Sequence, residues 1–227
     1  MCTIEWLIKR IKEEAEREEF PIDLATYREY NKNPTEPILY FGNLRSTICF
    51  FGRDLGRDEV RTGQPLIGAA GSMVRRGFFK ALYKRKPQNE EELSSIKNHV
   101  ILTNTVPYKP PENKAYSLKV KQRFRPFIEQ LLVIFWRGNQ IITLGTEAFK
   151  WFQEYATFKE EFDAFWNQGD SRYEKSISLT ISAKDEEGNI HQKPVTIYPL
   201  PHPSPLNQKY YQRFPLLLEN TLSRLAF

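Results

Sequence analysis

The chain has 227 residues, of which 40% are hydrophobic and 27% charged, and this balance excludes a fibrous or an intrinsically disordered protein. A chain of this length buries about 70–75% of the surface that it exposes when unfolded, so a single domain over residues 1–227 needs no disulfide or metal to be stable. The two cysteines, Cys2 and Cys49, are too few for a disulfide framework, a structural zinc site or an iron–sulfur cluster. We therefore expect one globular domain without a metal or another cofactor.

The 33 basic and 28 acidic side chains give a net charge of +5, which favours a polyanionic partner. Basic residues concentrate between Arg53 and Lys86, although a solvated basic face without any nucleic-acid role would show the same pattern. The longest apolar runs, such as Gln130–Trp136, are far shorter than the roughly 20 residues of a membrane-spanning helix. The first residues also lack the apolar core of a signal peptide. We expect a cytoplasmic protein with no membrane partner.

The first predicted elements are a helix, an arm and a strand. Apolar side chains at helical spacing over Ile4–Glu18 predict an amphipathic helix. Residues 20–43 are rich in Pro, Asn and Tyr and predict an irregular arm, so that helix and arm together occupy residues 1–45. The unbroken apolar run Thr47–Phe51 ends at Gly52 and predicts a strand that is buried on both faces.

Strands, loops and helices then alternate along the chain. In order we expect a helix over residues 66–82, a polar connector over 86–98, strands over Val100–Thr103 and Gln140–Thr143 with a helix over Phe124–Trp136 between them, a helix capped by Thr146, a hairpin of residues 176–183 and 195–198, and a closing helix over 210–226. This alternation predicts a mostly parallel sheet with helices on both faces. In such a sheet, ligands bind beyond the carboxyl ends of the strands.

Polar residues follow three of these strands, and each has a common structural explanation when taken alone. Asp54 lies in the tight turn Gly52–Gly56, where a carboxylate can orient water or stabilise a cation but more often caps the turn. Asn104 is commonly a turn former, and His202 between prolines commonly marks a rigid surface loop. Their conjunction at one edge of a sheet is the stronger signal.

With these motifs in this order, the sequence resembles the uracil-DNA glycosylase superfamily, and most closely its thermophile-type branch. The resembling segments are Gly52–Gly56 with its continuation to Gly71, Ile101–Pro111, Ile141–Gly145 and the second catalytic motif His202–Asn207. Together they cover the chain from about Phe50 to Phe214. The resemblance implies a three-layer α/β/α sandwich around a central, mostly parallel four-stranded sheet.

The resemblance also implies an enzyme that hydrolyses the N-glycosidic bond of a damaged base in DNA. Asp54 and His202 are the implied catalytic residues: Asp54 stabilises the cationic sugar and positions water, and neutral His202 donates to the departing base. The implied substrate-binding residues are Gly52, Arg53, Leu66, Asn104, Ser204, Leu206 and Asn207.

Within this set, Asn104 offers a carbonyl and an amide that fit the edge of uracil and not that of cytosine. Leu206 is the natural wedge for the gap that a flipped-out base leaves, although core packing is the alternative, and Ser204 can donate to a phosphate. Further candidate phosphate contacts are Lys209, Arg213 and the cluster from Arg75 to Lys86.

Three departures from the family pattern bear on the substrate. Leu66 stands where the family usually has a Phe that stacks on uracil, and Arg53 stands where the thermophile-type branch has Glu. Gly56 stands where another type has the Tyr that excludes the thymine methyl. The iron–sulfur cysteines of the thermophile-type branch are also absent. The preferred base therefore stays open among uracil, hypoxanthine, xanthine and a mismatched base.

A non-catalytic reader of damaged or single-stranded nucleic acid is the alternative function, since a fold alone does not fix an activity. The presence of both Asp54 and His202 favours the enzyme, whereas Leu66 and Arg53 favour the reader. For the enzyme we expect a monomer that acts on single- or double-stranded DNA in the cytoplasm, in association with the nucleoid.

Overall fold

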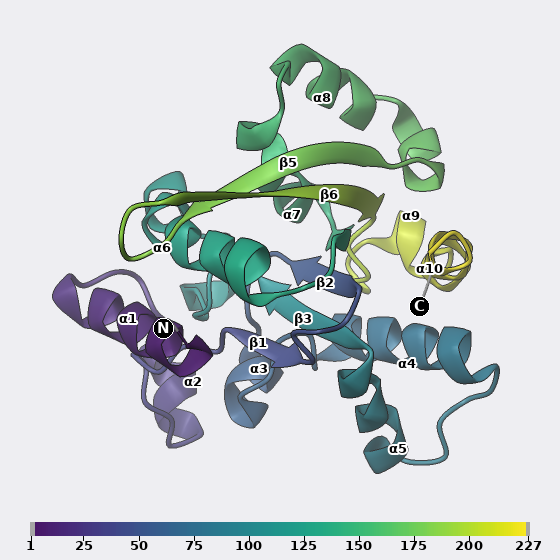
Figure 1. The fold of residues 1–227 in the computed structure, drawn as a ribbon. Helices are drawn as coiled ribbons and strands as arrows, with labels where there is room; N and C mark the ends of the chain where they lie inside the picture. Colours follow the sequence, from purple (N-terminus) through teal and green to yellow (C-terminus); the bar gives the residue numbers. More distant parts are fainter. Residues whose placement is uncertain (1–2, 226–227) are drawn as a thin grey trace.

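A mixed sheet of six strands runs through the structure, a computed structural model that describes residues 3–225 (Figure 1). In spatial order the strands are β1 (Tyr40–Gly42), β3 (Val100–Asn104), β2 (Ile48–Gly52), β4 (Gln140–Leu144), β6 (Ile190–Leu200) and β5 (Ile177–Lys184). The inner four are parallel, and β1 and β5 pair antiparallel at the two edges. The mostly parallel α/β fold is confirmed, but four strands were too few, because the arm and the hairpin each add an antiparallel edge strand.

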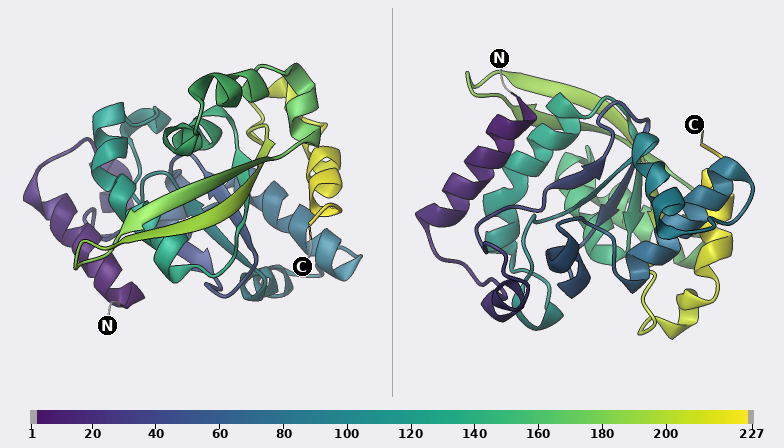
Figure 2. Two further views of the ribbon diagram at one scale, coloured as in Figure 1. Left: turned by 45° about the horizontal axis from the view of Figure 1, so that its top comes forward. Right: turned by 90° about the horizontal axis from the view of Figure 1, so that it is seen from below.

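Helices cover both faces of the sheet (Figures 1 and 2). One face packs against α1 (Ile4–Arg17), α6 (Leu118–Gln130) with its π-helical continuation Leu131–Phe135, α7 (Thr146–Lys150) and α8 (Lys159–Trp166). The other face packs against α4 (Ala69–Tyr83), α5 (Glu90–Ser94) and α10 (Phe214–Leu222). The short helices α2 (Leu24–Glu29), α3 (Arg57–Thr62) and α9 (Gln208–Tyr211) lie in the connections.

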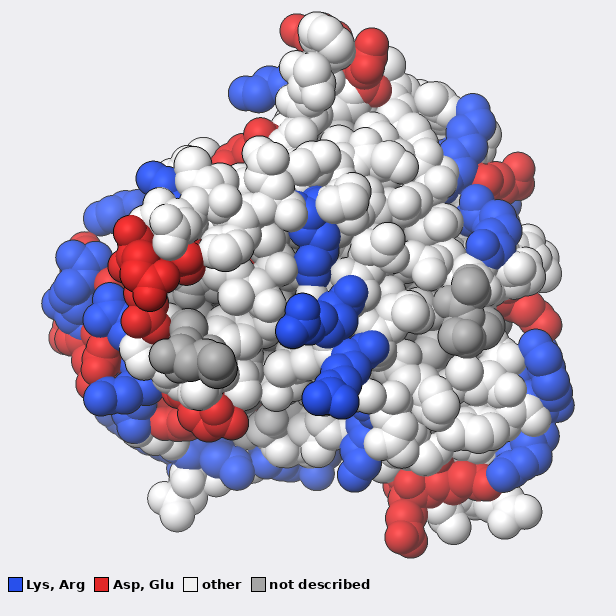
Figure 3. All heavy atoms as spheres, viewed as in Figure 1, with Lys and Arg blue, Asp and Glu red and all other residues white. Residues whose placement is uncertain are grey.

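Acidic side chains pair with half of the basic residues expected to cluster between Arg75 and Lys86. Three of these residues form ion pairs, Arg76 with Glu90, Lys80 with Glu219 and Arg85 with Glu92. Figure 3 shows the result over α4 and α5, at the lower right of that view, where groups of both signs lie next to each other. A cluster that is basic in sequence is therefore a mixed surface in space.

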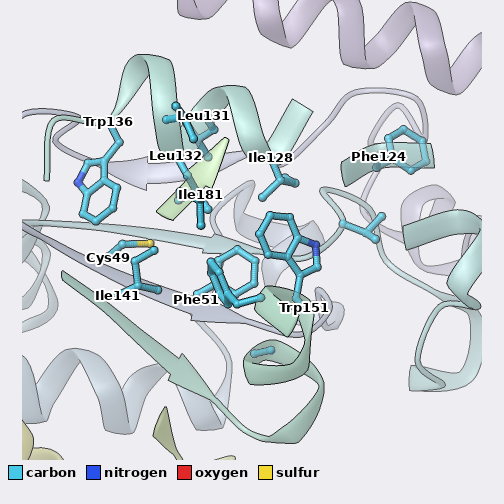
Figure 4. Close-up of a cluster of buried hydrophobic side chains, with 14 of the residues drawn as sticks. Cys49, Phe51, Phe124, Ile128, Leu131, Leu132, Trp136, Ile141, Trp151 and Ile181 are labelled. Atoms are coloured by element: carbon cyan, nitrogen blue, oxygen red, sulfur yellow. The ribbon is translucent and has the colours of Figure 1, made fainter. Parts of the chain in front are cut away.

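The side chains of β2 alternate between the two layers of the core. Cys49 and Phe51 pack into the cluster beneath α1 and α6, which Figure 4 shows, whereas Ile48 and Phe50 pack into the cluster beneath α4. All five residues of this strand are buried, which explains why it reads as a continuous apolar run rather than as an alternating one.

Two segments for which no helix or strand was expected contain regular structure. Within the polar connector over 86–98, Asn89 caps α5 by accepting the Glu92 N–H at 2.8 Å, and a 3₁₀ turn, Ser95–Asn98, follows. The arm over 20–43 contains α2 and β1.

The other helices begin or end a few residues from where the sequence placed them. The helix expected from Phe124 begins at Leu118 behind its cap Ser117. The cap of α7 is Gly145, and Thr146 is its first residue. The closing helix is broken into α9 and α10, and Ala226 lies outside the described residues.

Strand register brings the loops of the predicted site to one edge of the sheet. Gly52 at the end of β2 is the register partner of Asn104 at the end of β3, and Leu144 of β4 is the partner of Leu200 of β6. Because these four strands are parallel and end together, the segments that follow them lie at the same edge.

Candidate active site

The end of β2 packs closely against the side chains of Asn104 and Leu66, and glycine at position 52 permits this approach. A Cβ on Gly52 would lie 2.6 Å from Asn104 Nδ2 and 3.0 Å from Leu66 Cδ2. Thr105 holds the turn after β2 through its backbone N–H, which lies 3.1 Å from the Gly52 oxygen and 3.0 Å from the Arg53 oxygen. The backbone that presents Asp54 is therefore fixed from the neighbouring strand.

Asp54 is a buried carboxylate that can still accept a hydrogen bond from a ligand. Its side chain is 3% exposed, and Oδ2 lies 2.7 Å from Nε of Arg53 in an ion pair. Its Oδ1 has no hydrogen-bond partner among the residues that the structure describes. Burial raises the pKa of Asp54, the charges of Arg53 and Lys121 oppose that rise, and the charge of Glu147 adds to it.

Asn104 lies beside the turn but is not on the surface of a cavity. Its side chain is 2% exposed, and Nδ2 donates to the backbone oxygen of Asp54 at 3.2 Å. Its Oδ1 has no hydrogen-bond partner within residues 3–225, and a buried amide oxygen in that condition can accept a donor from a ligand. The structure thus places Asn104 next to Asp54 and Leu66 and behind the wall of the site.

His202 follows β6 and lies against the end of β4. Gly145 has φ +93°, and a Cβ there would lie 3.0 Å from the Cβ of His202, so glycine permits the close approach. The backbone oxygen of His202 accepts the Ser204 N–H at 2.9 Å and Asn207 Nδ2 at 3.1 Å. His202 is exposed, yet partial withdrawal from bulk water lowers its pKa, and the charge of Arg53 lowers it further.

The loop that carries His202 is braced internally and projects one apolar side chain. The Asn207 N–H donates to the Ser204 oxygen at 2.8 Å, and the Leu206 N–H donates to Ser204 Oγ at 3.3 Å. Leu206 is 95% exposed, so the alternative that it packs in the core is excluded. The braced loop therefore presents a leucine side chain to solvent.

Two adjoining hollows lie at this edge of the sheet. One, of about 340 Å³, is lined by Asp54, Leu66 and His202 among others. The second, of about 740 Å³, is lined by Gly145, Leu206 and Asn207 among others. Arg53, His202 and Ser204 line both hollows. Both volumes fall in the range of small-molecule sites, about 300–1,000 Å³.

The structure adds residues that the sequence did not single out. Lys121 on α6, 15% exposed, pairs with Glu147 on α7, and both charges act on Asp54. The helix expected from Phe124 had left Lys121 in a loop, so no signal placed it at the site.

One of the basic candidates needs correction, and two others are paired with an acid. The expectation that Arg75 contacts phosphate is wrong, because its side chain is buried and donates to the backbone oxygens of Pro65 and Leu66. Lys209 and Arg213 are exposed, and both pair with Asp170. A phosphate at either position would have to compete with that carboxylate.

The donor set does not fit an iron–sulfur cluster or another metal centre. Cys49 is buried within β2, where burial raises its pKa, and Cys2 lies outside the described residues. Over residues 3–225, His, Cys, Asp and Glu side chains form no group of three or more with the arrangement of a metal site. Within the same residues, every helix is too short or too polar to cross a membrane.

Asp54, His202 and the hollow between them combine groups suited to separating charge. A carboxylate with an unpartnered oxygen can stabilise a cation and hold a water, and a neutral imidazole can donate to an anion. Both are held on braced backbone at the carboxyl ends of parallel strands. The geometry is therefore able to support cleavage of a polar bond in a ligand that enters the hollow.

Comparison with known families matches residues 39–226 to the uracil DNA glycosylase superfamily. The chain is also similar to a type-4 uracil-DNA glycosylase of Archaeoglobus fulgidus, with 29% identity over 119 residues. That similarity covers 51% of this chain and 51% of the archaeal protein, so the chain spans about half the length of the curated relative that it matches. The family match is wider, since it includes all six strands of the sheet and the segments that carry Asp54 and His202. The chain belongs to the uracil DNA glycosylase superfamily.

Proposed function

We propose that this protein is a monofunctional DNA glycosylase that hydrolyses the N-glycosidic bond of uracil or another deaminated base and leaves an abasic site. The observation that carries the proposal is that Asp54 and His202, 148 positions apart along the chain, line one hollow of about 340 Å³. We further propose that it acts as a monomer on DNA in the cytoplasm, in association with the nucleoid and without a cofactor.

Asp54 serves the sugar side of the breaking bond. When the bond between C1′ and the base nitrogen breaks, its electron pair leaves with the base and the sugar becomes a cation. The Asp54 carboxylate stabilises that cation, and its unpartnered Oδ1 holds the attacking water. The water oxygen bonds to C1′ and its proton passes to the carboxylate. The ion pair with Arg53 opposes the effect of burial and favours the charged form of Asp54.

His202 serves the base side of the same bond. Its lowered pKa favours the neutral imidazole, which donates an N–H to the oxygen on which the departing base gathers negative charge. Water is the nucleophile in this scheme because the hollow has no lysine among its described lining residues.

Leu206 contacts duplex DNA beside the base that is flipped out. A base inside a duplex must be flipped out before it can enter the hollow, at a cost of a few kcal/mol. Leu206 stands on the rim of the adjoining hollow and is free to fill the vacated space in the stack. Asn104 would read the base edge through its free Oδ1 once the base has passed Leu66.

The test is a panel of oligonucleotides that carry uracil, hypoxanthine, xanthine or a mismatched thymine, incubated with the protein and then treated with alkali. An abasic product gives a strand break, and we expect one on at least one base of the panel. Tight binding without breaks on any base would instead identify a non-catalytic reader. The bases that are cleaved also give the preference of the enzyme.

A further inference from the structure

The wall of the hollow that holds Asp54 and His202 contains a residue in an unusual backbone conformation. Leu66 has φ +54°, in the left-handed region that residues other than glycine seldom adopt. Its side chain is buried and lines the hollow. A leucine keeps such a conformation only where its surroundings determine it.

Arg75 fixes the backbone of Leu66 from α4. Its Nε donates to the Leu66 oxygen at 2.7 Å, and its Nη2 donates to the Pro65 oxygen at 3.0 Å. The residue is 3% exposed, and its guanidinium lies 4.6 Å from the centre of the Phe41 ring. Burial lowers the pKa of Arg75 to about 10, which still leaves it charged at neutral pH, so both hydrogen bonds have a charged donor.

Glu59 fixes the backbone on the other side of Leu66. One oxygen of this buried α3 carboxylate accepts the N–H groups of Ile67 and Gly68, each at 3.0 Å. The other oxygen accepts the N–H of Gly56 at 3.0 Å. One side chain thus ties the turn that follows Asp54 to the turn that follows Leu66, and both turns contribute lining residues to the same hollow.

Leu66 in turn lies beside the residue proposed to read the base. A Cβ on Gly52 would meet both Leu66 Cδ2, at 3.0 Å, and Asn104 Nδ2, at 2.6 Å, so the two side chains flank the same point. Leu66 lines the hollow, whereas Asn104 is behind it. From the α4 side, a Cβ on Gly71 would lie 2.0 Å from the carbonyl of Leu66, so glycine at this position lets α4 pack directly against that backbone.

We propose that Glu59 and Arg75 are positioning residues that fix the backbone of Leu66, and that the Leu66 side chain, as the wall of the base pocket, decides which bases reach Asn104. The inference rests on the proposed glycosylase function, and it adds the residues that set its base selectivity. Neither Glu59 nor Arg75 acts on the reacting bond; each acts through the backbone on either side of Leu66.

Amide hydrogen exchange tests the first half of the proposal without any need for activity. In Glu59→Gln a single carbonyl oxygen remains and an NH₂ group faces backbone donors, so exchange at Gly56, Ile67 and Gly68 should rise by roughly tenfold or more while the strands keep their protection. Glu91→Gln, an exposed change on α5, is the control and should change none of the three. Unaltered exchange at these amides in Glu59→Gln would overturn the proposal.

Base selectivity tests the second half. Single-turnover excision of uracil and of hypoxanthine is measured for Arg75→Met, for Arg75→Lys, which keeps the charge and one donor group, and for Glu59→Gln. The wild-type preference, whichever base it favours, should weaken by roughly tenfold in Arg75→Met and Glu59→Gln and less in Arg75→Lys. The control is Arg76→Met, the exposed neighbour that pairs with Glu90.

The outcomes are distinguishable from failure of the proposed function. A general loss of folding would lower both rates together, so a preference that stays constant in Arg75→Met and Glu59→Gln would overturn the proposal even where both rates fall. A wild-type protein that excises no base would refute the proposed function, and the selectivity inference with it, before any variant is made.

Discussion

Arg53 is the residue whose charge reaches both proposed catalytic groups. It forms the ion pair with Asp54 and lines both hollows together with His202. Burial acts first on each group, raising the pKa of Asp54 and lowering that of His202, and the charge of Arg53 lowers both. A single guanidinium therefore favours the carboxylate and the neutral imidazole at once, which are the two protonation states that the proposed reaction needs. This gives a role to the position where the thermophile-type branch has Glu.

Replacing Arg53 should move the pH dependence of excision in a known direction. Without the positive charge, the pKa values of Asp54 and His202 both rise. The Asp54 carboxylate and the neutral His202 imidazole are then protonated already at a higher pH than in the wild type. The acid limb of the single-turnover rate of Arg53→Gln should therefore lie at higher pH than that of the wild type, and Arg53→Lys should stay close to the wild type. An acid limb that does not move in Arg53→Gln would show that this charge does not control the site.

The sequence indicated the residues that act on a ligand better than those that hold them in place. Asp54 and His202 stood out because each follows a strand in a motif with its own spacing. Glu59 and Arg75 did not, since both act through backbone groups of the turn around Leu66, and hydrogen bonds to a backbone leave no residue pattern. Arg75 was even assigned to phosphate, because a buried and an exposed arginine look alike in a sequence.

At the scale of elements, the strands with buried faces were predictable and the edges were not. The apolar runs that form β2, β3 and β4 are buried almost throughout, so hydrophobicity alone identified them. The edge strand β1 has only three residues, all half-buried, and the last of them is Gly42, so such a segment looks like a loop. The loop after β6 was identified by its His-Pro-Ser-Pro motif, but only the structure shows that Leu206 projects from it.

The exposed leucine of this loop should matter for duplex DNA in particular. Leu206→Ala removes the side chain that fills the gap in the base stack, and single-stranded DNA has no such gap to fill. Excision from a duplex should fall by roughly tenfold or more and excision from single-stranded DNA much less. Leu216→Ala, at another leucine that is 61% exposed, is the matched control and should affect neither substrate. Equal losses on both substrates would contradict the wedge role.

At the scale of the whole molecule, the hollows at the carboxyl edge of the sheet adjoin one another. A further hollow of about 310 Å³ between α6, α7 and α8 includes Lys150 and Lys159 in its lining and shares Glu147 with the hollow beneath Leu206. Lys150 and Lys159 therefore lie in a hollow that Asp54 does not line. This distribution suits a strand whose charge is on its phosphates and whose reacting sugar becomes cationic.

The salt dependence of DNA binding tests whether these lysines contact phosphates. In a plot of the logarithm of the DNA-binding constant against the logarithm of the salt concentration, Lys150→Ala and Lys159→Ala should each reduce the slope by about one unit. The loss of affinity should be the same for every DNA sequence. Lys32→Ala, an exposed change in the arm between α2 and β1, should leave the slope unchanged. Equal slopes in all three variants would place the phosphates elsewhere.

The most direct test of the proposed reaction is the single-turnover excision rate of Asp54→Asn and of His202→Ala on the base that the wild type cleaves best. Affinity for duplex DNA is determined in parallel. Each variant changes one side chain and leaves the other lining residues of the hollow in place, so binding should change little. Each rate should fall by roughly 100-fold or more, because either the sugar cation or the departing base loses the group that stabilises its charge. Wild-type rates in both variants would contradict the claim that this carboxylate and this imidazole carry out the reaction.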